Sequence, residues 1–234
     1  MAGLVVVTGG TKGIGRAIID KFAASGFDIC TCARGKKDLE ELASDLTTRF
    51  KVKVYFQVAD LSTLSDIKAF GKFVEGIGKP VDILVNNAGY FVPGQVTTEP
   101  DGTLEGMMSA NLYSAYHITR AIVGGMKSKK TGHIFNMCSI ASFTAYANGG
   151  SYAITKFAML GFSKVLREEL KEFGVRVTAV MPGATRTASW EGTDLPDERF
   201  MKPEDVAEAV FGAYSLSPQS VVEEIIIRPQ LGDI

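Results

Sequence analysis

The chain of 234 residues is 46% hydrophobic and 22% charged, enough apolar sequence for one substantial core, so we expect a single domain spanning residues 1–234. Lys and Arg total 25 against 26 for Asp and Glu, and the net charge of -1 offers no broad attraction to nucleic acid or to an acidic membrane. We therefore expect neither as a partner. The opening MAGLVVVTGG lacks a basic flank and a cleavage pattern, and the sequence has no apolar run approaching about 18 residues, so a cytoplasmic protein is predicted.

The three cysteines, Cys30, Cys32 and Cys138, are odd in number and lack the spacing of metal ligands. A disulfide framework or a metal site is therefore not expected. Cys30 and Cys32 lie two positions apart in an apolar stretch, which places them on the same side of a strand. We interpret all three as thiols that pack in the interior.

Short β-branched runs alternate with longer amphipathic segments along the whole chain. Apolar residues at helical spacing mark segments such as 36–50 and 63–76. Parallel strands need crossovers long enough to hold a helix, so the alternation predicts an α/β fold with a parallel sheet covered by helices on both faces. The stretch 183–203 is the longest irregular segment, either a flap over a binding site or a surface excursion. The predicted strands are 4–8, 28–32, 52–58, 82–86, 133–137, 175–180 and 221–227.

A glycine-rich turn, TGGTKGIG at residues 8–15, leads from the first predicted strand into a helix. Glycines there allow a tight turn and a close approach of the main chain to a pyrophosphate, and the N–H groups at the start of a helix attract anionic oxygens. The spacing Gly-x-x-x-Gly-x-Gly differs from the commoner Gly-x-Gly-x-x-Gly, so we predict a variant dinucleotide loop, with a ligand-free turn as the alternative. The glycines are Gly9, Gly10, Gly13 and Gly15.

The end of the second predicted strand bears on which nicotinamide cofactor fits. An acidic side chain there would hold the ribose hydroxyls of NAD, whereas an arginine accommodates the extra phosphate of NADP. The sequence CTCARGKK places Ala33 where the acid would stand and Arg34 directly after it, with Lys12 in the glycine turn as a second cation. We predict NADP, with NADPH preferred over NADH. The alternative is that Arg34 and Lys12 are solvated surface charges.

The stretch SYAITKF, residues 151–157, places Tyr152 and Lys156 four positions apart, on one face of a helix. Lowering the pKa of a tyrosine from about 10 to about 7 takes roughly 4 kcal/mol. A positive charge at about 5 Å supplies about 3 kcal/mol at an effective dielectric of about 20. With the remainder from an oxidised nicotinamide, we expect Tyr152 to exchange a proton with a carbonyl oxygen while hydride moves at its carbon. Alone, the spacing would indicate a surface pair.

Two further segments support a site. FNMCSIAS supplies Ser139, whose hydroxyl is placed to hydrogen-bond the same substrate oxygen, and Ser142 is a competing candidate. Ser139 is favoured because it lies nearer the carboxyl end of its strand, where such sheets bind ligands. LVNNAG at 84–89 ends another strand in Asn86 and Asn87, suited to cofactor approach or to an amide-stabilised turn.

Together these motifs resemble those of the short-chain dehydrogenase/reductase family over nearly the whole chain. TGGTKGIG is similar to its glycine motif, NNAG to its sheet-stabilising motif, SYAITK to its active-site helix, and PGATRT at 182–187 to the segment over the nicotinamide. The resemblance implies a doubly wound Rossmann sheet of seven strands in the order 3-2-1-4-5-6-7, in one domain. It also implies assembly as a homotetramer or homodimer.

The same resemblance implies a role for each site residue. Tyr152 would be the acid and base, Lys156 its partner and a ligand of the nicotinamide ribose, Ser139 the carbonyl positioner, and Asn111 the anchor of a water in the proton relay. From the residues alone, Asn111 is an oddly polar residue within a helix. Asp60 matches the position beside the adenine, and Thr187 the one that reaches the carboxamide. The full set of implied cofactor contacts is Gly9, Thr11, Lys12, Gly13, Ile14, Gly15, Arg34, Asp60, Leu61, Asn87, Ala88, Gly89, Tyr152, Lys156, Pro182, Gly183 and Thr187.

The end of the chain bears on the substrate. Family members that reduce 3-oxoacyl chains on acyl carrier protein commonly carry a Gly-Gly pair after the last strand, whereas this chain ends VVEEIIIRPQLGDI. That ending and SWEGTD at 189–194 resemble bacterial sepiapterin reductases and related small-carbonyl reductases. Trp190 would then be a flat wall for a ring substrate or a residue that packs the flap. The expected activity is reduction of a small ketone, diketone or sepiapterin-like carbonyl; the alternatives are 3-oxoacyl thioester reduction and an NADPH sensor without turnover.

Overall fold

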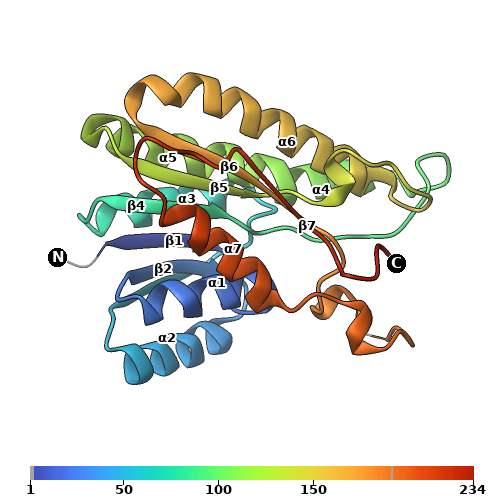
Figure 1. Cartoon of the computed structure of the whole chain (residues 1–234), viewed down its shortest axis with the longest axis horizontal. Helices are drawn as coiled ribbons and strands as arrows, with labels where there is room; N and C mark the ends of the chain where they lie inside the picture. The colour runs from blue at the N-terminus through green and yellow to red at the C-terminus, as the bar shows by residue number, and fades with distance from the viewer. Residues whose placement is uncertain (1–2, 191) are drawn as a thin grey trace.

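A computed structural model describes residues 3–190 and 192–234 of the chain, as one domain. In these residues, seven parallel strands form a single sheet in the order β3-β2-β1-β4-β5-β6-β7 (Figure 1). The order reverses direction beside β1, where the chain first winds outward through β2 and β3 and then returns to add β4 to β7. This is the doubly wound order that the sequence resemblance predicts. The strands are β1 Leu4–Thr8, β2 Asp28–Ala33, β3 Val54–Val58, β4 Val81–Asn86, β5 Gly132–Met137, β6 Val175–Pro182 and β7 Glu224–Ile227.

Helices cover both faces of the sheet (Figure 1). One face packs against α1, α2 and α7 in a core that includes Phe22, Leu46 and Val210. The other packs against α3, α5 and α6 in a core that includes Phe70 and Ile118. The helices are α1 Gly13–Ala24, α2 Lys36–Phe50, α3 Leu64–Gly76, α4 Thr103–Met108, α5 Ser114–Lys129, α6 Gly150–Leu170 and α7 Pro203–Tyr214.

Most predicted elements agree with the structure to within two residues at each end, and the seventh strand is the exception. It begins at Glu224 rather than at residue 221, because main-chain pairing with β6 starts at Ala179↔Glu224. Before that point β6 donates two hydrogen bonds to the chain, from the Thr178 hydroxyl to the Val222 carbonyl oxygen and from the Ala179 N–H to the Glu223 carbonyl oxygen. The apolar run 221–227 therefore predicted a strand that begins three residues too early, because Val222 meets the Thr178 side chain instead of the β6 main chain.

The cysteines lie in the interior, as predicted. Cys30 and Cys32 are fully buried and pack in the core beneath α3, and Cys138 is buried beside α6. Burial raises the pKa of the Cys32 thiol to about 12 and raises the pKa of Cys30 further. All three thiols therefore stay protonated and inert at neutral pH.

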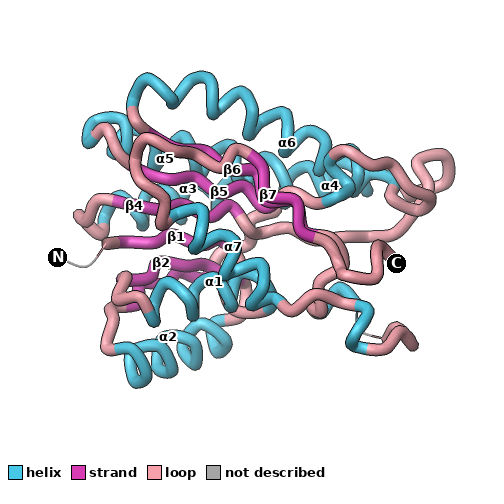
Figure 2. Tube along the Cα trace, in the orientation of Figure 1, coloured by secondary structure: helices cyan, strands magenta, loops and turns pink. Residues whose placement is uncertain are grey.

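The loops that follow the carboxyl ends of the strands gather at one end of the molecule (Figure 2). They include residues 87–102 after β4, residues 138–149 after β5 and the segment 183–203 after β6. That last segment contains two short 3₁₀ turns, Ala188–Trp190 and Asp197–Arg199, and a bridge between Thr185 and Met201 closes its base. In a doubly wound sheet this end holds the ligand.

No helix within 3–190 and 192–234 is long and apolar enough to cross a membrane. Across the same residues, no cluster of three or more His, Cys, Asp or Glu side chains is arranged to hold a metal ion.

His133 on β5 is fully buried, and its ring stacks on Phe135 with centroids 3.9 Å apart. Its Nε2 lies 2.7 Å from the Thr178 hydroxyl, and because that hydroxyl donates to the Val222 carbonyl oxygen, Nε2 carries the proton and donates to Thr178. Its Nδ1 has no hydrogen-bond partner among the residues that the structure describes. Burial, together with the charge of Arg176, lowers the pKa of His133 to about 2. The ring is therefore neutral in the folded chain.

This buried ring makes a prediction for the pH dependence of stability. Below the ordinary pKa of 6.5 the unfolded chain binds a proton at His133, and the folded chain binds one only near pH 2, so acid favours unfolding across that window. The free energy of unfolding should fall by about 1.4 kcal/mol per pH unit from this group below about pH 6. Urea unfolding from pH 7 to pH 4 measures it. His133→Gln should remove this component, whereas His117→Gln, on α5, should not; equal slopes for His133→Gln and the unsubstituted chain would contradict the assignment.

Candidate active site

The glycine turn between β1 and α1 brings the main chain close to the segment after β4. Gly9 has a φ of 67°, in the left-handed region that favours glycine. A Cβ on Gly15 would lie 2.5 Å from Asn87 Nδ2 and 2.5 Å from the Gly9 carbonyl oxygen, so side chains there are excluded. The turn therefore exposes main chain at the start of α1, which is the form of a pyrophosphate cradle.

Thr8, the last residue of β1, joins this turn to the NNAG segment. Its hydroxyl accepts hydrogen bonds from the N–H groups of Asn87, at 3.0 Å, and Ala88, at 2.9 Å. The Asn87 amide donates back to the carbonyl oxygens of Thr8, at 2.9 Å, and Gly9, at 3.0 Å. The amide-stabilised turn predicted for Asn87 is thus present, and the same amide holds the segment against the glycine turn. The sequence analysis missed Thr8, although a threonine that closes a strand before two glycines is a readable signal.

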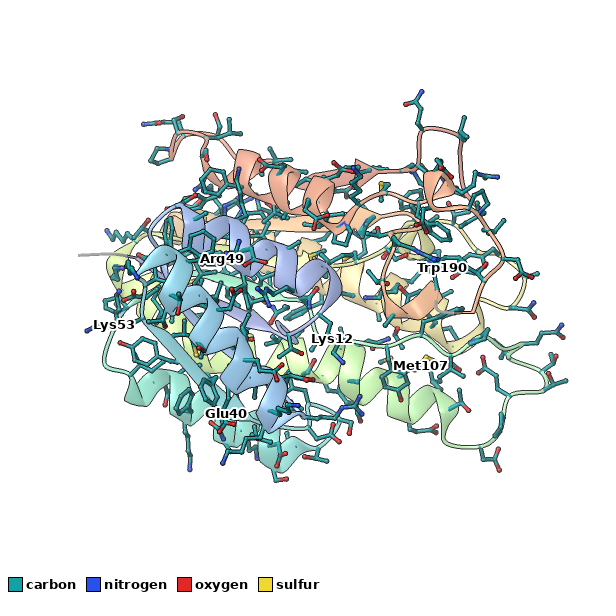
Figure 3. The ribbon with its side chains drawn as sticks, turned by 90° about the horizontal axis from the view of Figure 1, so that it is seen from below. Lys12, Glu40, Arg49, Lys53, Met107 and Trp190 are labelled. Atoms are coloured by element: carbon teal, nitrogen blue, oxygen red, sulfur yellow. The ribbon has the colours of Figure 1, made fainter. Side chains whose placement is uncertain are left out.

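Lys12 lies within the glycine turn, and Arg34 directly follows β2. The Lys12 side chain is 74% exposed and its ammonium lies 3.7 Å from an Asp38 carboxylate oxygen. Figure 3 shows Lys12 before α1, with Glu40 of α2 to one side and Trp190 to the other. An exposed pair 3.7 Å apart is weak, so a phosphate dianion competes well for this ammonium.

Other residues predicted to contact the cofactor lie after β3 and at the end of β6. Asp60 accepts hydrogen bonds from the N–H and hydroxyl of Ser62, which are the main causes that lower the pKa of Asp60. Leu61 is 7% exposed and packs in the core. A Cβ on Gly13 would lie 3.1 Å from Thr187, so the segment after β6 reaches the glycine turn. Pro182 ends β6, and the Gly183 N–H donates to the Ile227 carbonyl oxygen at 2.8 Å.

Tyr152 and Lys156 share one face of α6, as their spacing predicts. The Lys156 ammonium is 5.5 Å from the centroid of the Tyr152 ring. Lys156 is 6% exposed, and its Nζ donates to the Met137 carbonyl oxygen, the last of β5, at 2.7 Å. An ammonium has three donors, so after this bond donors remain for the hydroxyls of a ligand. Lys156 is therefore buried and Tyr152 partly buried, unlike a pair on an exposed helix surface.

The acidity expected for Tyr152 does not follow from the chain alone. Burial raises the pKa of Tyr152 above its ordinary value; a hydrogen bond with Ser139 opposes this effect, and Cys138 adds to it. Burial also lowers the pKa of Lys156. The expected lowering of the Tyr152 pKa included an oxidised nicotinamide beside the lysine; in the protein alone, burial outweighs the effect of Ser139.

Ser139 and not Ser142 faces Tyr152. The Ser139 hydroxyl lies near enough to the Tyr152 phenol to oppose the rise in the pKa of that phenol, and its Oγ accepts from the Ala141 N–H at 3.1 Å. The Ser142 hydroxyl instead accepts from the Ser139 N–H at 3.1 Å and is 1% exposed. Ser142 therefore shapes the turn after β5 that presents Ser139.

Asn111 lies in a π-helical turn, Ser109–Tyr113, between α4 and α5. Its side chain accepts from the Tyr90 N–H at 2.9 Å and donates to the Tyr90 carbonyl oxygen and the Thr155 hydroxyl, each at 3.0 Å. It is fully buried. Asn111 therefore ties the segment after β4 to α6, and its polarity inside a helix is explained by these partners. π turns of this kind are frequent at functional sites.

Two aromatic residues near the site, Phe91 and Tyr146, carried no sequence signal that we recognised. The Phe91 ring meets the Tyr152 ring edge-on at 4.9 Å. Burial raises the pKa of Tyr146 to about 12, and the nearby Tyr152 phenol adds to this effect. Trp190 packs edge-on against Phe200 at 5.2 Å, so it packs the flap, one of its two predicted roles.

The geometry defines a class of protein before any comparison. A main-chain cradle at the start of α1 fits a dinucleotide, and the buried Lys156 ammonium has donors left for ribose hydroxyls. A hydroxyl and a phenol, Ser139 and Tyr152, lie near each other beyond the end of β5. This is a set that polarises and protonates an oxygen, the arrangement of a dinucleotide-dependent oxidoreductase.

Comparisons with known proteins agree. The profile of the family described as short chain dehydrogenase matches residues 3–196. Sepiapterin reductase from Chlorobaculum tepidum is 32% identical, with 100% of this chain and 99% of that protein aligned. An alcohol dehydrogenase from the archaeon Thermococcus sibiricus, complexed with 5-hydroxy-NADP, superposes with a TM-score of 0.93 at 27% identity, covering 100% of this chain and 99% of that one. L-sorbose reductase from Gluconobacter frateurii, complexed with NADPH and L-sorbose, gives 0.89 at 28%, covering 98% and 96%.

The chain therefore belongs to the short-chain dehydrogenase family and is an oxidoreductase. The family match spans the glycine turn, the NNAG segment and the helix with Tyr152 and Lys156.

The Thr8 hydroxyl makes a prediction for stability. Thr8→Val keeps the shape of the side chain but leaves the N–H groups of Asn87 and Ala88 without an acceptor, which should lower the free energy of unfolding by about 2 kcal/mol. Urea unfolding measures the change. Thr8→Ser keeps the hydroxyl and should lose less than half as much; equal losses in both variants would show that the methyl group, and not the hydroxyl, matters.

Proposed function

We propose that this oxidoreductase is an NADPH-dependent carbonyl reductase of small substrates, with Ser139, Tyr152, Lys156 and Asn111 as its catalytic set. The observation that carries the proposal is the Tyr152 phenol, which lies near the Ser139 hydroxyl and one helical turn from the buried Lys156 ammonium. Two O–H groups that converge at one point bind one oxygen atom, and a carbonyl oxygen is the acceptor that fits them.

Each residue has a separate task in carbonyl reduction. NADPH supplies hydride to the carbonyl carbon. The Tyr152 O–H donates a hydrogen bond and then its proton to the carbonyl oxygen, while Ser139 holds that oxygen in place. The Lys156 ammonium, held by the Met137 carbonyl oxygen, offers its remaining donors to ribose hydroxyls and stabilises the phenolate left behind. Asn111 is included because its amide bonds Thr155 on the same helix.

The preference for NADPH rests on two cations and on the comparisons. Arg34 and Lys12 stand at the end of β2 and in the glycine turn, where the phosphate of NADP would lie. Solved relatives at 27–29% identity are complexed with NADP, NADPH or a derivative of NADP. The proposed contacts are the residues of the cradle and of the segment 182–187.

The proposed substrates are small ketones, diketones and sepiapterin-like carbonyls. Phe91 packs against Tyr152, and Tyr146 and Phe143, from the loop after β5, are 45% and 41% exposed. Such side chains favour a flat or apolar substrate body beside the carbonyl. The related proteins named for sepiapterin and L-sorbose support a small oxygenated carbonyl compound.

A screen of NADPH oxidation tests the substrate class. It contains sepiapterin, small diketones and an acetoacetyl thioester. Turnover of sepiapterin or diketones supports the proposal. Faster turnover of the thioester would favour the 3-oxoacyl reductase alternative. Tight NADPH binding without oxidation by any carbonyl would favour the sensor.

The proposed assembly is a homodimer or homotetramer. Three apolar side chains on α6, Ile154, Phe157 and Val165, are 42%, 47% and 56% exposed, and Tyr116 on α5 is 39% exposed. Apolar side chains clustered on two adjacent helices are usually covered by another chain.

The proton donor is tested by Tyr152→Phe. Removal of the phenol hydroxyl should lower kcat for carbonyl reduction by about 10³-fold, because a positioned acid contributes on that order, while NADPH affinity stays the same. Stopped-flow NADPH oxidation and a fluorescence titration measure the two quantities. Tyr55→Phe, on β3 at the opposite edge of the sheet, is the control. Undiminished turnover by Tyr152→Phe would refute the mechanism.

The cofactor preference is tested by Arg34→Ala. Loss of a charged contact with the phosphate should raise the Kd for NADPH about tenfold and leave that for NADH unchanged. Lys37→Ala, on α2 with its lysine 87% exposed and 3.7 Å from Glu41, is the matched control. An equal effect of Arg34→Ala on both cofactors would show that Arg34 is a surface charge without a role in selectivity.

A further inference from the structure

The start of α6 is held by a loop from elsewhere in the chain. Gly94, in the loop after β4, forms a bridge with Gly149, and its N–H donates to the Asn148 carbonyl oxygen at 3.1 Å. Figure 1 shows this loop beside the start of α6, at the end of the molecule where the strands finish. The helix that carries Tyr152 and Lys156 therefore begins against a segment more than 50 residues earlier.

Glu99 of that loop binds the first turn of α6. Its Oε1 accepts from the Ser151 N–H at 2.9 Å, and its Oε2 accepts from the Ser151 hydroxyl. Gly149, the residue that precedes the helix, has no side chain to cap it. A helix start leaves N–H groups without partners inside the helix, and a carboxylate is a strong acceptor for them. Glu99 thus supplies from a distance the cap that α6 lacks.

Two glycines, Gly94 and Gly150, leave room for the Glu99 side chain. A Cβ on Gly150 would lie 1.8 Å from Glu99 Oε1 and 2.5 Å from the Gly94 carbonyl oxygen, and Gly150 has a φ of +38°. A Cβ on Gly94 would lie 2.8 Å from Glu99 Cγ. Glycine at both positions is what lets the carboxylate reach the helix main chain.

The contact lies next to the proposed proton donor. Ser151 directly precedes Tyr152, so an acceptor that fixes the Ser151 main chain also fixes the first turn from which the phenol projects. The same loop carries Phe91, which packs against the Tyr152 ring at 4.9 Å. Lys156 lies one turn further on and has its own anchor, the Met137 carbonyl oxygen. Loss of the Glu99 contact would therefore release Tyr152 and leave Lys156 in place.

We propose that Glu99 is a positioning residue for carbonyl reduction: its carboxylate clamps Ser151 and thereby holds the Tyr152 phenol in register with Ser139. The inference rests on the proposed function. Misplacement of a catalytic group by a fraction of an ångström lowers kcat without weakening cofactor binding. A residue that only stabilised the fold would change both together.

The test compares Glu99→Ala, Glu99→Gln and Glu105→Ala in the full chain. Glu99→Ala should lower kcat about tenfold or more and leave the Kd for NADPH within about twofold, because only the first turn loses its acceptor. Glu99→Gln keeps an oxygen for the Ser151 N–H and should stay within about threefold of the unsubstituted chain. Glu105→Ala, an exposed glutamate on α4, is the matched control and should change neither value.

Amide hydrogen exchange gives a readout that does not depend on turnover. In Glu99→Ala the amides of residues 150–155 should exchange about tenfold faster, and those of residues 158–170 should be unchanged. Ser151→Ala added to Glu99→Ala should produce little further loss, because both act through one contact.

The outcomes separate this inference from the proposed function. If kcat of Glu99→Ala stays within twofold while Tyr152→Phe is inactive, Glu99 is not a positioning residue and the function stands. If Glu99→Ala and Glu99→Gln lose kcat and NADPH affinity alike, the residue serves the fold and the inference is overturned. If Tyr152→Phe keeps full turnover, the proposed function fails first, and the positioning role fails with it whatever the exchange rates show.

Discussion

The site depends on one buried contact, the hydrogen bond of the Lys156 ammonium with the Met137 carbonyl oxygen at 2.7 Å. An ammonium that is 6% exposed loses most of its water, and burial lowers the pKa of Lys156 accordingly. The Met137 carbonyl oxygen, at the end of β5, replaces part of that hydration. The same hydrogen bond fixes the position of α6 relative to the sheet. Every other group of the site is placed with respect to this helix and this strand end.

Parallel topology brings those groups together at low cost. Because all strands of the sheet end on one side, the turn after β1, the NNAG segment after β4 and Ser139 after β5 reach the same region without a long connection. Side chains then lock neighbouring ends in pairs. Thr8 joins the turn after β1 to the segment after β4, because its hydroxyl accepts from the N–H groups of Asn87 and Ala88. Asn111 joins the segment after β4 to α6 through Tyr90 and Thr155.

The parts of the site that depend on local spacing could be predicted from the sequence, and the parts that depend on distant partners could not. Four-residue spacing placed Tyr152 and Lys156 on one face, and strand ends favoured Ser139 over Ser142. The cap from Glu99 joins residues 52 apart in the chain, and the π turn at Asn111 needs the Tyr90 main chain as its partner. The spacing also could not show that burial raises the pKa of Tyr152, because burial depends on residues that other elements pack around the phenol.

The raised pKa bears on the role that we propose for Tyr152. A phenol whose pKa is raised by burial is fully protonated at neutral pH, and a protonated phenol is the form that reduction of a carbonyl consumes. A base for alcohol oxidation would need the opposite shift, which the chain alone does not supply. Positive charge brought by an oxidised nicotinamide would favour the phenolate. Burial alone therefore keeps the Tyr152 phenol protonated. We expect its pKa to fall when an oxidised nicotinamide is bound beside it.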